Sequence, residues 1–255
     1  MKKFSLTIYA GLIGLVALFC AFETEAKTLR IAIGLSIPPY VIEHENRGIE
    51  YDILKEILES QGYEMEPVFV PLGRTLHLLK HGKVDGSMST GLKGLPGCYT
   101  DPHITYWNFA ISLKSEKLEI NSVQDLRHKR VISFQNAKNY LGAEFHEMAK
   151  VNKRYTEIAD QSIQSKLLFL RRVDVVVADR FIFEWYRKDP EVKKFVDTSQ
   201  GVVHHRLFEP SSFSAVFKSD EVCLAFNKGL KQMKASGRYE EIIASYNVAE
   251  PILAN

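Results

Sequence analysis

The stretch Leu78-Leu79-Lys80-His81-Gly82-Lys83-Val84-Asp85 decides the fold, because the chain repeats it later as Leu168-Phe169-Leu170-Arg171-Arg172-Val173-Asp174. Each copy is typical of the last turn of an amphipathic helix with a basic carboxyl end, where cations suit the helix dipole. In each copy Val-Asp then opens a short strand that a sheet can bury, Gly86-Ser-Met-Ser or Val175-Val-Val-Ala. The alternative is that any two α/β units look alike. We interpret the repeat as two α/β lobes, and the space between lobes is where ligands usually bind.

The composition is that of an ordinary globular protein. The 255 residues leave room for one large domain or for two of usual size. Hydrophobic residues make up 45% of the chain, charged residues make up 25%, and the formal net charge is +2. Because no basic stripe is interleaved with aromatic residues, nucleic-acid binding is not predicted.

The amino terminus has the pattern of an export signal. Lys2 and Lys3 are followed by almost uninterrupted apolar sequence from Phe4 to Ala21, and Thr24-Glu25-Ala26 offers small residues where a signal peptidase cuts. We predict that residues 1–26 are a signal peptide and that the exported chain begins at Lys27. The alternative is an uncleaved membrane anchor.

Export would place Cys98 and Cys223 in an oxidising compartment, where they could form one disulfide. The alternative is that Cys223 fills an apolar helix face with Phe226, Leu230 and Met233. No metal or redox motif is present, so neither a metal nor a cofactor is predicted. His77 and His81 share a helix face, but no third ligand accompanies them.

Strands and helices alternate after the predicted signal peptide. The first half predicts strands and helices in turn over Thr28–Leu35, Tyr51–Gln61, Met65–Val70, Arg74–His81 and the strand from Gly86. The second half predicts the same alternation over Val131–Phe134, Ala137–Ala149, Arg154–Ile158, Ser162–Arg171, Val173–Ala178 and Arg180–Arg187. This order favours largely parallel sheets with right-handed crossovers.

Two extended segments, near residues 108–114 and 206–217, separate the halves. The first half has too few strands for a comfortable sheet, so we expect the closing helices, Glu221–Ala235 and Tyr239–Tyr246, to return to it. Lobe 1 is therefore predicted to consist of residues 27–110 and 207–255, and lobe 2 of residues 111–206. The two crossings would form a hinge that permits rigid-body closure.

Several short motifs occur in a characteristic order behind the predicted signal peptide. They are Pro38-Pro39-Tyr40, Gly48-Ile-Glu-Tyr-Asp-Ile-Leu-Lys-Glu-Ile-Leu with Gly62, Gly82-Lys-Val-Asp-Gly, Asp101-Pro102, Ser122-Val-Gln-Asp-Leu before Lys129-Arg-Val, Asp174-Val-Val-Val-Ala-Asp179 and Lys234-Ala-Ser-Gly-Arg-Tyr-Glu-Glu-Ile. In this order the chain resembles the extracellular solute-binding proteins of family 3, over essentially its whole mature length. The resemblance implies a type II two-lobed periplasmic binding protein, a monomer that hands a small amino acid-like solute to the membrane permease of an ABC transporter.

The sequence departs from the family's pattern in the ligand site. Members normally hold the ligand's carboxylate with an Arg shortly before the Asp-Pro, whereas the segment Gly91–Cys98 contains no Arg. Lys93 could supply a charge there, but without the bidentate fork of a guanidinium. The Gly-Thr-Thr usual in lobe 2 is replaced by Asn136-Ala137-Lys138.

The resemblance also implies ligand-binding roles for residues at strand ends. Ser89 and Thr90 end the third strand, where the family offers backbone and hydroxyl groups. Asp179 stands where the family's acid meets the ligand's amine, although it could equally cap the helix from Arg180, or do both.

Other candidate ligand-binding residues flank these strand ends. Arg74, in the first turn of a helix, is our candidate for the missing anion clamp, because helix amino ends favour anions; the alternative is an ordinary surface Arg. The remaining candidates are Tyr40 and Leu72, as walls of the pocket, and Asn136, Lys138 and Asn139, from lobe 2.

The sequence thus predicts a binding protein for an amino acid or a similar small zwitterion rather than an enzyme. One alternative is an enzyme that resembles the cyclohexadienyl dehydratases on this scaffold, in which Glu184 would be the nearest general acid. Another alternative is a sensory module that reports the ligand to a membrane receptor.

Overall fold

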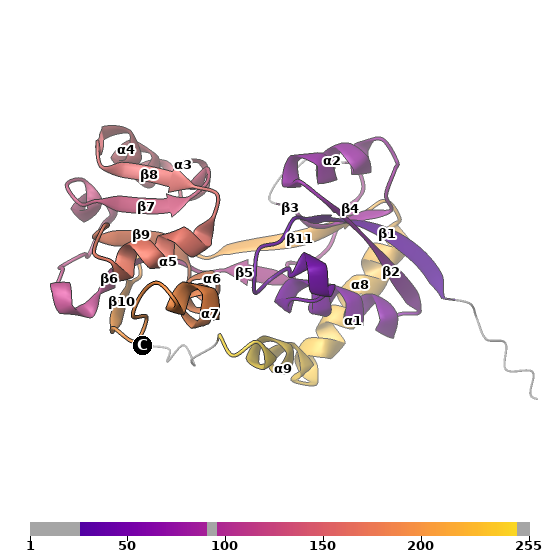
Figure 1. Ribbon diagram of the computed structural model, residues 1–255. Helices are drawn as coiled ribbons and strands as arrows, with labels where there is room; N and C mark the ends of the chain where they lie inside the picture. The colour runs from indigo at the N-terminus through magenta and orange to yellow at the C-terminus, as the bar shows by residue number, and fades with distance from the viewer. Residues whose placement is uncertain (1–25, 91–95, 249–255) are drawn as a thin grey trace, which may run out of the picture.

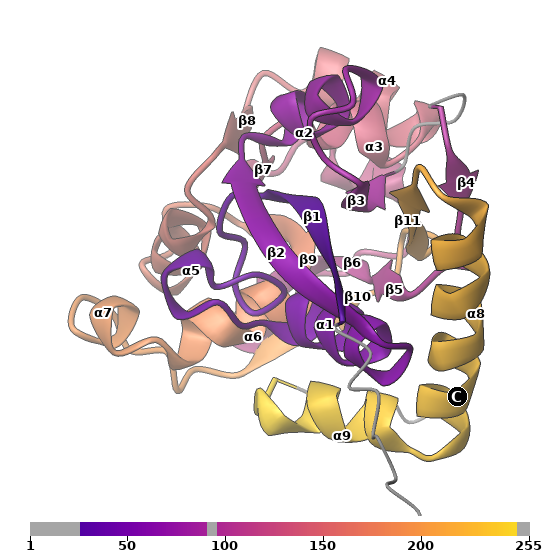
Figure 2. The ribbon, with the colours of Figure 1, turned by 90° about the vertical axis from the view of Figure 1, so that its right-hand side faces the viewer.

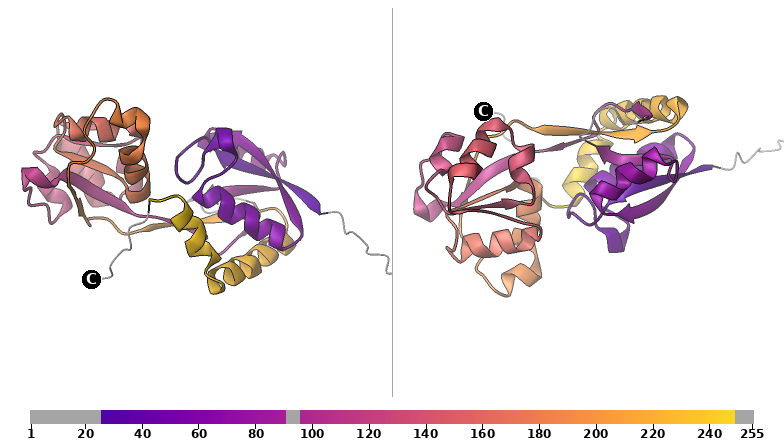
Figure 3. Two further views of the ribbon diagram at one scale, coloured as in Figure 1. Left: turned by 60° about the horizontal axis from the view of Figure 1, so that its bottom comes forward. Right: turned by 90° about the horizontal axis from the view of Figure 1, so that it is seen from above.

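The computed structural model describes residues 26–90 and 96–248, and it has two lobes, each a sheet flanked by helices (Figure 1). The predicted signal peptide, apart from Ala26, and part of the segment Gly91–Cys98, including Lys93, lie outside the described residues. Strands join the lobes, as two further views make clear (Figure 3). The two-lobed α/β fold is therefore as predicted.

Lobe 1 is built on a mixed sheet with the strand order β2-β1-β3-β11-β4, and β5 also pairs with β11. The strands are β1 Lys27–Gly34, β2 Tyr63–Val70, β3 Gly86–Thr90, β4 Cys98–Tyr99, β5 Ile104–Tyr106 and β11 Ser211–Phe217. Strands β2, β1 and β3 are parallel, whereas β11 is antiparallel to its neighbours. The flanking helices are α1 Ile49–Ser60, α2 Leu72–Lys80, α8 Asp220–Ala235 and α9 Arg238–Ser245, with the short 3-10 helix η1 Glu43–Glu45.

Lobe 2 repeats this plan with the strand order β10-β6-β9-β7-β8. The strands are β6 Asn108–Leu113, β7 Val131–Phe134, β8 Tyr155–Ile158, β9 Val175–Asp179 and β10 Val202–His205. Strands β9, β7 and β8 are parallel, and β6 and β10 add antiparallel pairs that the sequence pattern did not indicate. The helices are α3 Ala137–Tyr140, α4 Ala143–Val151, α5 Gln161–Phe169, α6 Arg180–Lys188 and α7 Pro190–Lys193, with the 3-10 helices η2 Lys114–Glu116 and η3 Val123–Leu126.

One helix prediction was wrong. The segment predicted as a continuous helix from Ala137 to Ala149 is two helices, α3 and α4, which meet at Gly142. Gly142 has a φ of 89°, a left-handed conformation that glycine adopts without steric cost and that an α-helix cannot contain.

The repeated sequence folds into the same turn in both lobes. The amide of Lys83 donates to the carbonyl of Leu78, and the amide of Arg172 donates to that of Leu167, each at 2.9 Å. These six-residue bonds close the carboxyl ends of α2 and α5 as Schellman motifs. The left-handed residue that the motif requires is Gly82 in lobe 1 and Arg171 in lobe 2.

An Arg–Asp pair then ties each turn to the neighbouring strand. In lobe 1 the carboxylate of Asp85 accepts the amide of Arg30 at 2.9 Å, and in lobe 2 that of Asp174 accepts the amide of Arg130 at 2.7 Å. The two guanidinium groups also donate to backbone carbonyls of these turns, Lys83 O at 2.8 Å and Arg171 O at 3.0 Å. The resemblance of the two copies therefore extends to individual hydrogen bonds.

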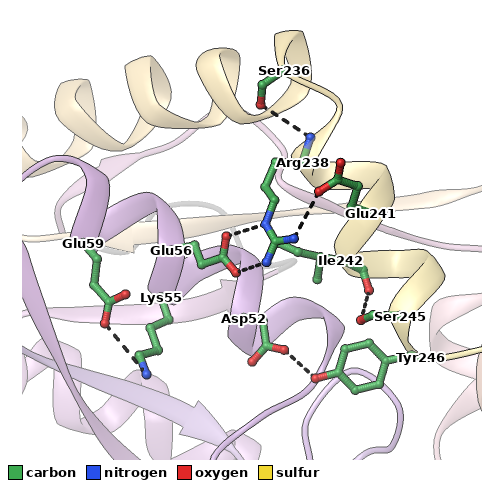
Figure 4. A network of polar contacts seen from close by, with 10 residues as sticks. All are labelled: Asp52, Lys55, Glu56, Glu59, Ser236, Arg238, Glu241, Ile242, Ser245 and Tyr246. Atoms are coloured by element: carbon green, nitrogen blue, oxygen red, sulfur yellow. Dashed lines mark hydrogen bonds and ion pairs between the residues drawn. The ribbon is translucent and has the colours of Figure 1, made fainter.

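The closing helices return to lobe 1, where they cover α1 (Figures 2 and 4). Arg238 at the start of α9 donates to both carboxylate oxygens of Glu56, at 2.9 and 2.7 Å. The hydroxyl of Tyr246 accepts the amide of Gly48 and donates to Asp52. These contacts fix α9 against α1.

The Arg–Asp pairs of the two turns should contribute to stability. We expect Asp174→Ala and Asp85→Ala each to lower the free energy of unfolding by about 1 to 3 kcal/mol, because each leaves a backbone amide without its acceptor. Urea unfolding of the purified protein measures this. Glu147→Ala, on an exposed face of α4, is the control and should change the value by less than about 0.5 kcal/mol. Equal effects of the three substitutions would contradict the role of the pairs.

Candidate ligand-binding site

The carboxyl ends of the parallel strands of the two lobes are turned toward each other. Helix α2 follows β2 in lobe 1, and α3 follows β7 in lobe 2. Figure 1 shows α2 and α3 at the same height on facing sides of the lobes, and Figure 2, seen along the line that joins the lobes, shows them close together in projection. Ligands of α/β proteins bind outside the carboxyl ends of parallel strands. The candidate site is therefore the region between these ends.

Over residues 26–90 and 96–248 the chain passes between the lobes at two places. On the first passage, β5 ends at Tyr106 and β6 begins at Asn108, so Trp107 alone separates the two sheets. On the second passage, β10 ends at His205 and β11 begins at Ser211, opposite Tyr106. Because Phe208 is still buried in the core of lobe 2, little backbone is left there to bend.

Asp179 lies at the junction of these parts. It is the last residue of β9 and the N-cap of α6, and only 3% of its surface is exposed. Its Oδ1 accepts hydrogen bonds from the amides of Phe181 at 2.9 Å and Ile182 at 3.1 Å, and its Oδ2 accepts one from the amide of Trp107 at 2.7 Å. The helix-capping role considered from the sequence is thus present in the structure.

Tyr40 supplies a further hydrogen bond to Asp179, and this bond crosses from lobe 1 to lobe 2. Its hydroxyl donates to Oδ1 at 3.0 Å, and its side chain is fully buried. The ring contacts those of Tyr106 and Phe181, with centroids 4.1 and 6.2 Å away. In this conformation Tyr40 therefore joins the lobes instead of lining an open pocket.

The backbone around Tyr40 explains its position. Its carbonyl accepts the amides of Glu50 and Tyr51 at the start of α1, at 3.1 and 3.3 Å. This close approach requires Gly48, because a Cβ there would lie 2.3 Å from the carbonyl oxygen of Tyr40. The φ of Gly48, 139°, is also one that other residues rarely adopt.

A second group of polar side chains, the buried Glu50 and His103 with Tyr106, lies beside Tyr40 in lobe 1. The hydroxyl of Tyr106 donates to Glu50 at 3.2 Å, and the other carboxylate oxygen of Glu50 lies 2.9 Å from Nε2 of His103. Glu50 is 1% exposed and His103 is not exposed at all. Tyr106 is thus held to lobe 1, while the next residue, Trp107, is bonded to Asp179 of lobe 2.

Burial raises the pKa of Asp179 from 3.8 to about 6, although the hydrogen bonds from the amides of Ile182 and Trp107 and from Tyr40 act in the opposite direction. A carboxylate removed from water is stable only while such donors face it. Near neutral pH the junction therefore contains a buried negative charge that is balanced by hydrogen bonds.

A cavity of about 290 Å³ adjoins this junction. It is lined by Ile104, Thr105, Trp107, Asp179, Arg180, Phe181, Tyr239 and Ile243. These residues come from the first passage, from the start of α6 and from α9, so lobes 1 and 2 both contribute to its wall. The cavity would change shape whenever the lobes move.

The predicted lobe 2 residues surround a carboxylate that the sequence did not indicate. Glu157, in β8, accepts the amide of Asn136 at 2.9 Å and that of Lys138 at 3.2 Å. The hydroxyl of Tyr155 donates to it at 2.7 Å. The backbone amides of two residues proposed to bind the ligand, Asn136 and Lys138, are therefore occupied by a side chain of the protein. Asn139 donates its amide to the carbonyl of Asn136.

The predicted lobe 1 residues lie at the edge that faces lobe 2. Leu72 begins α2, and Arg74 is exposed in its first turn. Ser89 is half-buried near the end of β3, and Thr90 pairs with Ser214 of β11. The structure thus brings Tyr40 to Asp179 and gathers Asn136 and Lys138 around Glu157, with Arg74 on the other lobe.

Cys98 and Cys223 form a disulfide that joins β4 to α8, both in lobe 1. Glu184, the general acid considered for an enzyme, faces Arg187 and His204 on the side of α6 toward β10, at 3.4 and 3.6 Å. It does not line the cavity beside Asp179.

Sequence reasoning missed Glu157 and Trp107. A signal for Glu157 was present, because it lies near the carboxyl end of a predicted strand beside the strand that precedes Asn136. Trp107 acts through its backbone amide, which no sequence pattern indicates. Among residues 26–90 and 96–248, no group of three or more His, Cys, Asp and Glu side chains could hold a metal ion. Over the same residues, no helix combines the length and apolar character needed to cross a membrane.

The fold and the paired strand ends define a two-lobed binding protein of the periplasmic type. The chain belongs to the bacterial extracellular solute-binding proteins of family 3, whose family model matches residues 29–249.

Individual relatives are distant but cover nearly the whole chain. A probable histidine-binding protein of Campylobacter jejuni is 24% identical over an alignment of 270 positions, gaps included, which covers 97% of this chain and 100% of the relative. The arginine-binding extracellular protein ArtP of Bacillus subtilis is 24% identical over 95% of this chain and 96% of the relative. The ligand-binding core of GluR0 in complex with L-glutamate has a similar fold, with a TM-score of 0.67 and 16% identity over 88% of this chain and 99% of that one.

The bond between Tyr40 and Asp179 should make stability depend on pH. The folded protein binds the Asp179 proton more tightly than the unfolded chain, so this residue's contribution to the free energy of unfolding should decrease as pH rises from about 4 to about 6. Tyr40→Phe removes a donor to the ionised form and so raises the pKa of Asp179 in the folded state further. Its cost should therefore be constant up to about pH 6 and grow above it, to about 1.5 to 3 kcal/mol.

Denaturant unfolding at several pH values measures this cost as the difference between wild type and variant. Tyr239→Phe is the matched control, because it removes a hydroxyl that donates to the neutral carbonyl of His103. Its cost should not change with pH. A Tyr40→Phe cost that is equally independent of pH would contradict the assignment.

Proposed function

We propose that the chain is a periplasmic binding protein that captures an amino acid or a similar small polar solute by closing its lobes, and then delivers it to the membrane permease of an ABC transporter. Family membership supports solute binding. The names of the relatives, which describe histidine and arginine binding, support an amino acid ligand. The carboxyl ends of strands in both lobes face one region, and within the described residues two short passages of chain join the lobes. This observation carries the proposal.

Closure would turn about Trp107 and the segment between Phe208 and Ser211. At Trp107, the bond of Tyr106 to Glu50 holds the chain to lobe 1, and the bond of the Trp107 amide to Asp179 holds it to lobe 2. Movement would therefore be concentrated in very few backbone torsions. This arrangement favours rigid-body closure over a general loosening of the lobes.

In the proposed complex, lobe 1 binds the anionic end of the solute. Arg74 would pair with its carboxylate, with Ser89 and Thr90 as further donors and Leu72 as an apolar wall. Asp179 would attract the amine through Oδ2, because a carboxylate oxygen can accept a second hydrogen bond beside that from Trp107. Tyr40 would hold this carboxylate in place through its hydrogen bond to Oδ1. Asn136, Lys138 and Asn139 would approach the solute from lobe 2.

A binding role is favoured over catalysis. The candidate general acid, Glu184, is engaged with Arg187 and His204, away from the strand ends. We further propose that residues 1–26 are removed on export, and that the mature protein acts as a monomer in the periplasm without a cofactor.

Calorimetric titration of the exported, purified protein with the common amino acids tests the proposal. At least one should bind, and Arg74→Ala should weaken its binding by about tenfold or more, equivalent to about 1.4 kcal/mol. Arg172→Ala, an exposed Arg at the end of α5, is the control and should leave the affinity unchanged. If no common amino acid binds, the proposed function is wrong.

A further inference from the structure

Glu157 is held in one orientation at the edge of lobe 2. Strand β8 pairs with β7 so that Glu157 lies opposite Ser133, near the carboxyl ends of both strands. The hydroxyl of Ser133 lies 2.7 Å from that of Tyr155, which in turn donates to Oε1 of Glu157. The amides of Asn136 and Lys138 add two further donors, on Oε2 and Oε1. The carboxylate is therefore preorganised and cannot simply turn away into solvent.

Glu157 is also charged at neutral pH. Burial alone would raise its pKa, but the hydrogen bonds from Tyr155, Lys138 and Asn136 bring the pKa below its usual value. The residue remains partly exposed to solvent. Lobe 2 thus presents a fixed, half-buried negative charge at the end of the sheet that faces α2.

This charge changes what lobe 2 can bind. The amides at the start of α3 would suit an anion, but Glu157 already occupies those of Asn136 and Lys138. A solute carboxylate at the same place would meet a like charge and would find these donors taken, which disfavours its binding. An ammonium or guanidinium group would find a carboxylate whose Oε2 can accept another hydrogen bond.

Lobe 1 carries the opposite charge on the facing side. Arg74 is exposed in the first turn of α2, and Lys80, its last residue, is also exposed. Because α2 lies opposite α3 across the space between the lobes (Figures 1 and 2), the two sides are complementary to a solute with separated charges. Its anion would face α2 and its cation would face Glu157.

We propose that Glu157 is a ligand-binding residue that receives a cationic group of the solute, so that the solutes of this protein carry an ammonium or guanidinium group beyond the α-amine. This inference rests on the proposed function and specifies its solute class. Tyr155 is a positioning residue, because its hydroxyl holds the carboxylate in place.

L-arginine and L-citrulline test the inference, because citrulline replaces the guanidinium by a neutral urea group of nearly the same shape. Wild-type protein should bind arginine at least about tenfold more tightly than citrulline, as measured by calorimetry. Glu157→Gln, which keeps the acceptor oxygen and loses the charge, should weaken arginine binding by about tenfold and change citrulline binding by less than about twofold. Tyr155→Phe should reduce the preference for arginine by a smaller factor.

Asp160→Asn is the matched control for net charge, since Asp160 is an exposed carboxylate three residues further along the chain. It should change the binding of both solutes by less than about twofold. Thermal unfolding of each variant in the absence of solute shows whether it remains folded. The inference is overturned if the folded Glu157→Gln variant weakens the binding of arginine and citrulline equally, or weakens the binding of neither. Glu157 would then only cap α3.

A wider panel separates this inference from the proposed function. Binding of neutral or acidic amino acids, without binding of arginine, lysine, histidine or agmatine, would overturn the role of Glu157 and leave the proposed function intact. If none of these compounds binds, both the role of Glu157 and the proposed function are overturned. Agmatine, which lacks the carboxylate of arginine, should bind more weakly than arginine but should show the same sensitivity to Glu157→Gln.

Discussion

The buried carboxylate of Asp179 is the constraint on which the rest of the structure depends. It ends the central strand of lobe 2, caps α6, accepts the amide of the residue that separates the two sheets, and accepts the hydroxyl of Tyr40 from lobe 1. An ionised group buried this deeply is tolerated only where donors surround it. A single side chain therefore sets the positions of β9, α6, Trp107 and Tyr40 relative to one another.

The repeated helix-to-strand sequence allowed the two lobes to be predicted, and for a physical reason. Each copy contains its own helix end, its own turn and the Asp that binds the neighbouring strand, so its structure is determined largely by local interactions. The short strands β4, β5 and β10 were not predicted, because their pairing depends on partners far away in the chain. The break at Gly142 was missed because the apolar spacing continues across it, and only the backbone conformation marks the end of α3.

The candidate site could be predicted in part. Strand ends can be located from the sequence, so Ser89, Asn136 and Asp179 could be assigned to the edges that face each other. Their hydrogen-bond partners could not, since the bond from Tyr40 to Asp179 joins residues 139 positions apart and those of Glu157 depend on the register of β8. The sequence therefore indicated which residues lie at the facing edges. It did not indicate which of them already form hydrogen bonds within the protein. This distinction matters most for Glu157, which changes the charge that lobe 2 offers.

Helix α6 has a consequence for the evolution of this protein. Its residues follow β9 in lobe 2, yet Ile182 is buried in the core of lobe 1, where Phe181, Trp185 and Tyr186 also pack. Recombination that exchanged one whole lobe for that of a distant relative would place a foreign helix in this core and a foreign partner beside Tyr40. Exchange of one lobe alone would therefore disturb the core of the other, whereas single substitutions at the facing edges would leave that core intact.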